Sequence, residues 1–264
     1  MSVPIHPVKH IYLDGKGHPV PYAGMAIAKK EIHKHDVVHK FGNSESIGAA
    51  GQTLWTGTNS YYTYLGSCQQ LRVTSTNSVD GAGTTGAQVV TLFGLDEDFN
   101  EQQEVIELNG ITPVTTVNCY CRMNRIVVNS AGPLGWNAGE IWATDLNTAY
   151  ANSGEPTFKL AHVHTGNNQT LMCLWTVPAD KLALIPDIQV SGNKNKGVDW
   201  ELVARPFGEV FQVKLHHHLF QQAYQFHYKV PIRFEAKTDL EMRVRSDASN
   251  TEVSGQFCVI TVED

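Results

Sequence analysis

The segment GLDEDFNEQQEVIELNG carries oxygen-bearing side chains at the spacing of a calcium-binding EF-hand loop. Positions one, three, five and twelve of such a loop fall on Asp96, Asp98, Asn100 and Glu107. An EF-hand also needs a glycine at position six and a helix on either side, whereas position six is Glu101 and the flanks are short β-branched runs. The pattern therefore predicts the tip of a β-hairpin, with acidic side chains hydrogen-bonded to local backbone, and not a calcium sensor.

Two further motifs match catalytic or cofactor-binding patterns in residue type but not in their expected structural context. HDVVH, from His35 to His39, resembles the zinc-protease pattern HExxH, but Asp36 is shorter than the glutamate that activates water, and no helical context surrounds it. GAGTTG, from Gly81 to Gly86, satisfies GxGxxG, but it precedes a strand instead of following one and opening a helix. We predict a solvated segment for the first motif and a flexible turn for the second.

His162 and His164 form an HxH pair on a predicted strand, which places both imidazoles on one face. A cupin-like metal site uses such a pair with a nearby glutamate and a further histidine, and the residues that follow, TGNNQT, supply neither. The run from His216 to His218 offers another ligand only if the strands are neighbours. His162 and His164 are kept as metal candidates, with ordinary half-exposed histidines preferred. We predict no catalytic residues, no metal and no cofactor.

The segment WTGTNSYYTYLG concentrates aromatic side chains among small polar residues. Its aromatic members are Trp55, Tyr61, Tyr62 and Tyr64. Such mixtures are common in surfaces that bind sugars or proteins, and equally common where a peripheral strand packs onto a core. We favour packing or a subunit contact, and keep the four residues as candidates for a ligand- or partner-binding surface.

The composition favours short strands over helices and gives no support for a nucleic-acid partner. The 264 residues carry a formal net charge of −6, and no basic run is present. Charged residues make up only 17 %, whereas Gly, Ser, Thr, Asn, Val and Gln are plentiful, which suits strands joined by turns. The amino terminus lacks the order of a secretory signal, and no apolar stretch approaches the roughly 20 residues of a membrane span. We therefore expect neither direct nucleic-acid binding nor membrane insertion.

The five cysteines are an odd number and form no CxxC motif. Cys119 and Cys121 lie two residues apart, so on a strand they share a face, which is a poor geometry for bridging each other. We expect reduced, mostly buried thiols and a chain made in a cytoplasm.

Strand signals separated by turn residues recur about every ten residues from Leu54 onward. The predicted strands include Gln88–Leu95, Gln103–Leu108, Asn124–Asn129, Thr170–Val177 and Lys181–Val190. In YQFHYKVPIRFEA apolar and polar side chains alternate with a period of two, and Pro231 marks an edge strand or a break. Residues 239–246 repeat the alternation. The pattern predicts an all-β protein, most simply an antiparallel, jelly-roll-like β-sandwich.

Residues 1–50 differ from the rest of the chain. They hold four prolines and six histidines but few apolar clusters. This composition predicts an extended amino-terminal arm that gains order on a neighbour and not by folding alone. Residues 51–264 are assigned to the β-sandwich, and a division into sub-domains 51–190 and 191–264 stays open.

Four stretches between Lys40 and Leu184 carry a resemblance to a known family. They are KFGNSESIGAAGQTLW, LRVTSTNSVDGAGTTGAQVVTLFGLDEDFNEQQEVIELNGITPVTTVN, YCRMNRIVVNSAGPLGWNAGEI and NQTLMCLWTVPADKLAL. In this order they resemble structural virion proteins of tailed bacteriophages that are frequent in marine phages. The resemblance implies a structural particle protein, whether capsid decoration, head fibre or tail-associated, and it brings no catalytic residues. The last eighty or so residues lie outside it.

The leading hypothesis is a non-enzymatic structural protein of a tailed-phage virion, assembled in the host cytoplasm. Because no long repetitive shaft sequence is present, we favour a capsid decoration or cement subunit over a tail or fibre component. The expected partners are the major capsid protein or neighbouring head and tail subunits, and further copies of the chain in a homo-oligomer. Two alternatives stay open: a tail- or fibre-associated module that binds a host receptor or glycan near Trp55, and a cupin-like metal-dependent enzyme using His162 and His164.

Overall fold

The computed structural model describes residues 12–13, 19–20, 23–148, 156–192, 197–220 and 223–263. The described part is almost entirely β-structure, with one short helix, α1 (Ala23–Ala28). Strand pairings are antiparallel, as in the pairs of longest register. The predicted all-β, antiparallel class is therefore confirmed. No helix among these residues has the length and apolarity needed to cross a membrane.

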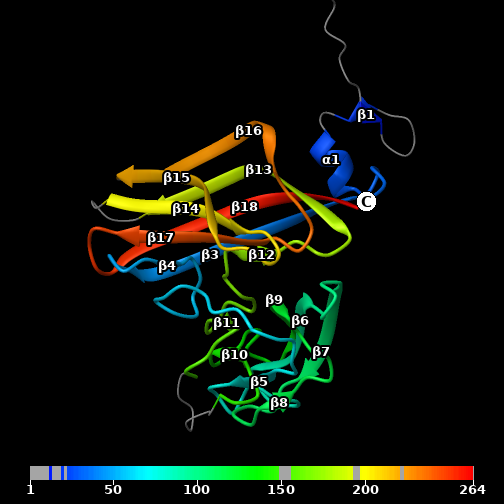
Figure 1. Ribbon diagram of the computed structural model, residues 1–264. Coiled ribbons are helices and arrows are strands. Elements are labelled where there is room, and N and C mark those ends of the chain that lie inside the picture. Colours follow the sequence, from blue (N-terminus) through cyan, green and yellow to red (C-terminus); the bar gives the residue numbers. More distant parts are fainter. Residues whose placement is uncertain are drawn as a thin grey trace, which may run out of the picture.

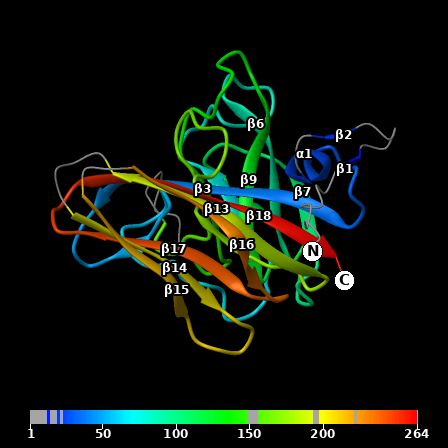
Figure 2. The ribbon, with the colours of Figure 1, turned by 90° about the horizontal axis from the view of Figure 1, so that it is seen from above.

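Nine strands form a two-layer sandwich, which we call the framing unit. They are β3 (His35–Ile47), β4 (Gln52–Thr53), β12 (Leu174–Thr176), β13 (Lys181–Gly192), β14 (Gly197–Arg205), β15 (Gln212–Phe220), β16 (Ala223–Phe234), β17 (Asp239–Ser246) and β18 (Thr251–Glu263). One sheet has the order β16-β13-β18-β3, and the other has the order β12-β17-β14-β15 with β4 added beside β17. Figure 2 shows these two layers side by side, with β3, β13 and β18 in one and β14, β15 and β17 in the other. Ile188 and Phe257 of the first sheet meet Trp200 and Met242 of the second in one hydrophobic core.

Seven strands form a smaller pair of sheets, which we call the inserted unit. They are β5 (Arg72–Ser75), β6 (Ala87–Leu95), β7 (Glu101–Glu107), β8 (Val114–Thr115), β9 (Arg122–Ala131), β10 (Ile141–Thr144) and β11 (Ala161–Val163). The sheet orders are β11-β10-β5-β8 and β7-β6-β9. A second core, which includes Leu71, Leu92 and Ile126, fills the space between them. The remaining strands, β1 (Tyr12–Leu13) and β2 (Pro19–Val20), pair with each other.

The inserted unit interrupts the framing unit in sequence. The chain builds β3 and β4, makes the whole inserted unit, and returns to the framing unit at β12, so that the two bodies lie one above the other in Figure 1. β3 pairs with β18, the last strand, along most of its length. The possible division into sub-domains 51–190 and 191–264 is therefore wrong, because the framing unit takes strands from both sides of that boundary and from before residue 51.

A short wall shared by both cores connects the two units. In the segment around β12, Met172 and Leu174 face the core of the inserted unit, whereas Cys173 and Trp175 face the core of the framing unit. This is the alternation of an extended chain with apolar neighbours on both sides. β3 runs so close to the wall that a side-chain carbon at Gly42 would lie 2.1 Å from the carbonyl oxygen of Leu54. Glycine is required there for that close approach.

The predicted amino-terminal arm needs a correction at its carboxyl end. Residues 35–47 are not an arm, because they form β3 and exchange main-chain hydrogen bonds with β18. The motif HDVVH lies at the start of this strand, so its surroundings are those of a sheet and not of a zinc-binding helix. In Figure 2, α1, β1 and β2 lie beside the first residues of β3, near the end of β18. Residues 1–11 fall outside the described residues, and the arm remains a prediction for them.

The side chains of the edge strand β16 are more exposed than the sequence pattern predicted. The alternation predicted one dry face, but Phe226 is 40 % and Val230 is 81 % exposed. The register with β13 shifts between Ile185 and Asp187, so the stretch before Pro231 is carried away from its neighbour. A proline and a bulge on an edge strand hinder pairing with another chain. The prediction of an edge strand at Pro231 is confirmed.

Candidate functional site: a buried charge network between the units

The charged face of β17 carries an unusual set of buried groups. The core-facing residues Leu240, Met242 and Val244 are buried, as the alternation predicts. The opposite face was expected to be wet, yet the carboxylates of Asp239 and Glu241 are only 2 % and 0 % exposed. Arg122 of β9 and Tyr64 reach them from outside the framing unit. The inserted unit and the chain leading into it therefore cover what would otherwise be a solvated face.

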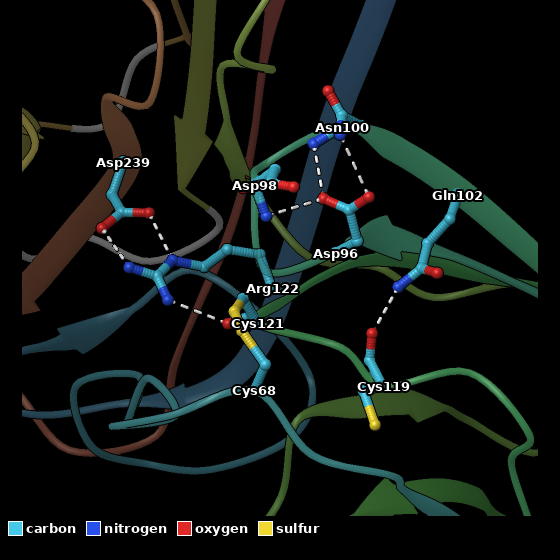
Figure 3. Close-up of a disulfide and its surroundings, with 9 residues drawn as sticks. All are labelled: Cys68, Asp96, Asp98, Asn100, Gln102, Cys119, Cys121, Arg122 and Asp239. Carbon is cyan, nitrogen blue, oxygen red and sulfur yellow. Dashed lines mark hydrogen bonds and ion pairs between the residues drawn. A yellow bond between two sulfur atoms is a disulfide. The ribbon is translucent and has the colours of Figure 1, made fainter.

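Asp239 receives two arginines from different units. Arg122 of the inserted unit donates from Nε and Nη2 to the two carboxylate oxygens, at 2.7 and 3.2 Å (Figure 3). Arg205 at the end of β14 donates from Nε and Nη2 to Oδ2, at 2.9 and 2.6 Å, and the Thr176 hydroxyl donates to Oδ1 at 2.6 Å. One buried carboxylate thus binds β9, β12 and β14 together, and its oxygens are saturated by donors.

Glu241 plays the matching role two residues later. It accepts from Nε and Nη2 of Arg243, at 3.0 and 3.2 Å, and from the Tyr64 hydroxyl at 3.5 Å. The Thr53 hydroxyl also donates to Glu241, while Thr53 Oγ1 accepts from the amide of Tyr62 at 2.7 Å. The segment that leaves β4 for the inserted unit is therefore attached to β17 through side chains.

The arginines alternate with aromatic rings in one continuous stack, which we call the cation–aromatic ladder. In order it runs through Tyr61, Arg243, Phe211, Arg205, Tyr64, Arg122, Phe99, Lys237 and Phe207. Each cation lies over two rings, at 4.4 to 5.5 Å from the ring centroids. Such contacts contribute about 0.5–2 kcal/mol each, with the larger values where water is excluded. The ladder crosses the junction, because Phe99 and Arg122 belong to the inserted unit.

This arrangement suits mechanical coupling and not catalysis. A general base needs a carboxylate with a free lone pair near a substrate, and a nucleophile needs such a base beside it. Here the carboxylates of Asp239 and Glu241 are occupied by guanidinium and hydroxyl donors. Burial, with Glu241 and Asp239 nearby, raises the pKa of the Tyr64 hydroxyl well above its ordinary value, so this phenol stays protonated. The network fixes the orientation of one unit on the other.

A disulfide between Cys68 and Cys121 adjoins the ladder. It joins the chain before β5 to the residue that precedes Arg122, and the Cys121 carbonyl accepts from Arg122 Nη1 at 2.8 Å (Figure 3). The prediction of reduced thiols is therefore wrong for these two residues. The pairing joins residues 53 positions apart, which spacing in the sequence does not reveal. The other cysteines are free thiols: Cys119 is exposed, Cys258 is half-buried and Cys173 is buried.

The four aromatic candidates separate into different roles. Trp55 and Tyr62 are 1 % and 7 % exposed and pack edge to face in the core of the inserted unit, with ring centroids 5.1 Å apart. They cannot offer a ligand- or partner-binding surface, which corrects that proposal for them. Tyr64 is half-buried in the ladder. Tyr61 is 47 % exposed and remains the one accessible member of the four.

The metal candidates His162 and His164 lie on and just after β11, and only one of them is exposed. Both ring nitrogens of His162 are engaged: Nδ1 contacts the carbonyl and hydroxyl of Thr56 at 2.9 and 3.0 Å, and Nε2 contacts Glu140. Its ring also stacks on Trp142 with centroids 3.7 Å apart. No group of three or more histidine, cysteine, aspartate or glutamate side chains in the described ranges is arranged to hold a metal. His162 therefore acts as a structural bridge.

The pair Glu140–His162 predicts a loss of stability in acid. Burial alone would raise the pKa of Glu140, but hydrogen bonds from His162 and Thr165 outweigh it and lower the pKa from 4.5 to about 2. Burial also lowers the pKa of His162 despite the opposing influence of Glu140. The unfolded chain therefore binds protons more readily than the folded chain at both sites. Their contribution to the unfolding free energy is full at neutral pH. The part due to His162 declines as the pH falls below 6.5, and the part due to Glu140 declines from pH 4.5 toward 2.

Urea unfolding measured from pH 7 to pH 2.5 checks this expectation. We expect Glu140→Gln to flatten the loss of unfolding free energy with decreasing pH, chiefly below pH 4.5, because the carboxylate that stays ionised in the folded state is gone. Glu107→Gln is a matched control, because Glu107 is an exposed carboxylate on β7 of the same unit. Parallel pH curves for the wild type and Glu140→Gln would contradict the assignment.

The acidic segment between β6 and β7 is a hairpin tip. Asp96 Oδ1 accepts from the amides of Asp98 and Asn100, at 2.9 and 2.8 Å, and the Asn100 amide group donates to Asp96 Oδ2 at 3.1 Å (Figure 3). Phe99 adopts a positive φ of 69° to close the turn, and its buried ring joins the ladder. The predicted turn is confirmed, and it also supplies a residue to the junction.

The GAGTTG segment is a loop wound around a buried carboxylate. Asp80, which is 0 % exposed, accepts from the Ser75 hydroxyl at 2.6 Å and from the amides of Ala87, Ala138 and Gly139, each at 2.8 Å. The predicted turn before β6 is confirmed. Asp80 itself went unnoticed in the sequence, because a single aspartate in a glycine- and serine-rich stretch reads as an ordinary turn residue.

No family model and no curated protein matches the chain. Among solved structures it is similar to that of infectious bursal disease virus, Gt strain, with 9 % identity, 88 % of this chain and 73 % of that chain covered, and a TM-score of 0.23. The VP2 subviral particle of the same virus gives 10 % identity, coverages of 88 % and 73 %, and a TM-score of 0.24. The PBSX exported protein XepA gives 10 % identity, coverages of 96 % and 99 %, and a TM-score of 0.19. Scores of this size carry no argument about relationship or role.

Proposed function

We propose that the chain is a non-enzymatic structural protein of a tailed-phage virion, most simply a capsid decoration or cement subunit on the head surface. The observation that carries the proposal is the junction between the two units. Buried carboxylates, which an enzyme would leave free for substrate, are here saturated by Arg122, Arg205 and Arg243, and the contact of Arg122 with Asp239 joins the two units. A subunit that holds its neighbours in fixed positions on a particle surface needs such rigidity more than it needs a reactive site.

Two further features support the proposal. The stretches that resemble tailed-phage virion proteins run from Lys40 to Leu184, which covers the inserted unit, β4, β12 and the part of β3 from Lys40 onward. The disulfide between Cys68 and Cys121 suits a protein that works outside a reducing cytoplasm, as the surface of a released particle does. Assembly with other virion subunits and with copies of itself belongs to the same proposal.

The alternatives lose the residues on which they depended. A receptor- or glycan-binding module centred on Trp55 lacks an accessible site there, because that indole is buried in the inserted unit. A cupin-like metal site at His162 and His164 loses one of its two ligands, because His162 has no free ring nitrogen for a metal.

Removal of residues 2–22 tests the anchoring part of the proposal. We expect the number of copies per purified particle to fall several-fold, because an arm that orders on a neighbour adds buried area to the contact. The truncation stops before α1, so it leaves β3 whole. The measurement is the occupancy of the subunit in a particle reconstruction or by quantitative mass spectrometry.

Two controls separate anchoring from folding. A variant in which a glycine–serine linker of equal length replaces residues 2–11 keeps the chain length but removes the chemistry of the segment. Thermal unfolding of the isolated truncated protein should match that of the wild type. Undiminished occupancy would remove the anchoring role, and absence of the full-length protein from purified particles would remove the virion role altogether.

A further inference from the structure

A cleft lies between the two units on the side of β3. It has a volume of about 640 Å³ and opens between residues 37–40 of β3 and the sheet β7-β6-β9 of the inserted unit. Its apolar walls include Phe93, Val127 and Trp175, and Gln103, opposite Phe93 in the neighbouring strand, also lines it. The volume falls in the range of small-molecule sites, which combine apolar walls with a few convergent polar groups.

Two cations line this cleft without a carboxylate partner. Lys40 is 2 % exposed, and its ammonium group donates to the main-chain oxygen of Asn124. The guanidinium of Arg125, which is half-buried, donates from Nη2 to the main-chain oxygen of His39 at 2.6 Å. Within the described ranges, the ion pairs of the structure include neither Lys40 nor Arg125. Glu101 at the rim is already paired with Lys181.

A buried cation without a carboxylate partner is unfavourable, and elsewhere in the molecule partly buried arginines pair with carboxylates. Arg122, Arg205 and Arg243 each meet a carboxylate in the ladder, in a chain whose net charge is −6. Neutral carbonyls stabilise a cation less than a carboxylate does. The cleft is therefore the described region where positive charge gathers at a concave, partly apolar surface and lacks its counter-charge.

The amount of charge indicates a singly charged ligand. Burial lowers the pKa of the Lys40 ammonium to about 7, with a smaller contribution from the nearby Arg125. Arginine stays protonated even when its pKa is lowered by burial, as it is for Arg125. At neutral pH the cleft thus carries between one and two positive charges, which a carboxylate matches more closely than a dianion does.

We propose that the cleft between β3 and the β7-β6-β9 sheet is a binding site for a small carboxylate-bearing sugar, held by Arg125 and Lys40. The planar guanidinium of Arg125 suits a carboxylate in bidentate geometry. The apolar wall at Phe93 and Val127 offers a surface for the sugar ring, and Gln103 offers a polar group for its hydroxyls. The proposal stands on the cleft alone and does not depend on the virion role.

Isothermal titration calorimetry with sodium glucuronate tests the proposal on the full chain at low ionic strength. We expect saturable binding of glucuronate, none of glucose, which lacks the carboxylate, and weaker binding of inorganic phosphate. Arg125→Gln should weaken glucuronate binding about ten-fold or more, because a charge-assisted hydrogen bond is lost. Lys40→Met should weaken it too, and Arg125→Lys should restore part of the affinity by restoring the charge.

Arg233→Gln is the matched control, since Arg233 is exposed, lies outside the cleft and pairs with Glu235. Its affinity for glucuronate should equal that of the wild type. Circular dichroism establishes that each variant is folded, and Arg125→Gln alone decides the question if Lys40→Met does not fold. Absence of saturable binding, equal binding by Arg125→Gln, or a preference for phosphate or glucose would each overturn the proposal.

Discussion

Replacement of Asp239 by alanine is expected to lower the unfolding free energy by about 3–5 kcal/mol, the cost of removing one partner from a buried ion pair. The carboxylate is 2 % exposed and holds Arg122 and Arg205 from two different units. Without it, two guanidinium groups stay beside each other in the junction with no anion between them. The measurement is urea unfolding of the purified chain, followed by circular dichroism.

The loss should also change how the two units unfold. In the wild type we expect one transition, because the ladder and the wall around β12 connect both cores. In Asp239→Ala the inserted unit should lose its fixed orientation, and the transition should broaden or divide into two. Asp239→Asn, which keeps the shape but not the charge, provides a second variant if the alanine variant does not fold.

A surface carboxylate on the same segment of chain supplies the matched control. Glu235 is 71 % exposed and pairs with Arg233 at 3.0 Å, so Glu235→Ala should change the unfolding free energy by no more than about 0.5 kcal/mol. A double-mutant cycle between Arg122 and Asp239 isolates their interaction from the general cost of each change. A coupling energy near zero would show that the junction is held by apolar packing and not by the charge network.

Sequence patterns predicted those elements whose signal is local. The strands β6, β7, β9, β13 and β17 lie close to their expected positions, because alternation and turn residues act over a few neighbouring residues. The turn at Asp96 was recognisable for the same reason. The apolar run around Leu174 was predicted as a strand, although its position between two cores became visible only in the fold.

The candidate site could not be predicted in the same way, because its members come from distant parts of the chain. Arg122, Arg205 and Asp239 meet only after the inserted unit has folded against the charged face of β17. The alternation in β17 distinguishes two faces, but it does not say that a second unit covers the charged one. One signal was available: Asp239 and Glu241 are followed by Arg243 and Arg245 on a single face, an arrangement able to form ion pairs with a facing unit.

Removal of the disulfide is expected to have the second large effect. Cys68 and Cys121 are 53 positions apart, and the chain-entropy relation for a loop of that length gives about 4 kcal/mol of stabilisation. The variant with both residues changed to serine should lose about this much unfolding free energy. Reduction should lower the midpoint of thermal unfolding of the wild type and leave that of the double variant unchanged, because only the wild type has a bond to break.

Counting the reactive thiols tests the disulfide between Cys68 and Cys121 without a measurement of stability. In unfolded, unreduced protein three of the five cysteines should react with a thiol reagent, and all five should react after reduction. Cys119→Ser is the matched control, because Cys119 is exposed and unbridged; its loss should lower each count by one and leave the unfolding midpoint unchanged. Five reactive thiols before reduction would contradict the bond. The start of β9, and with it Arg122, would then be held by the charge network alone.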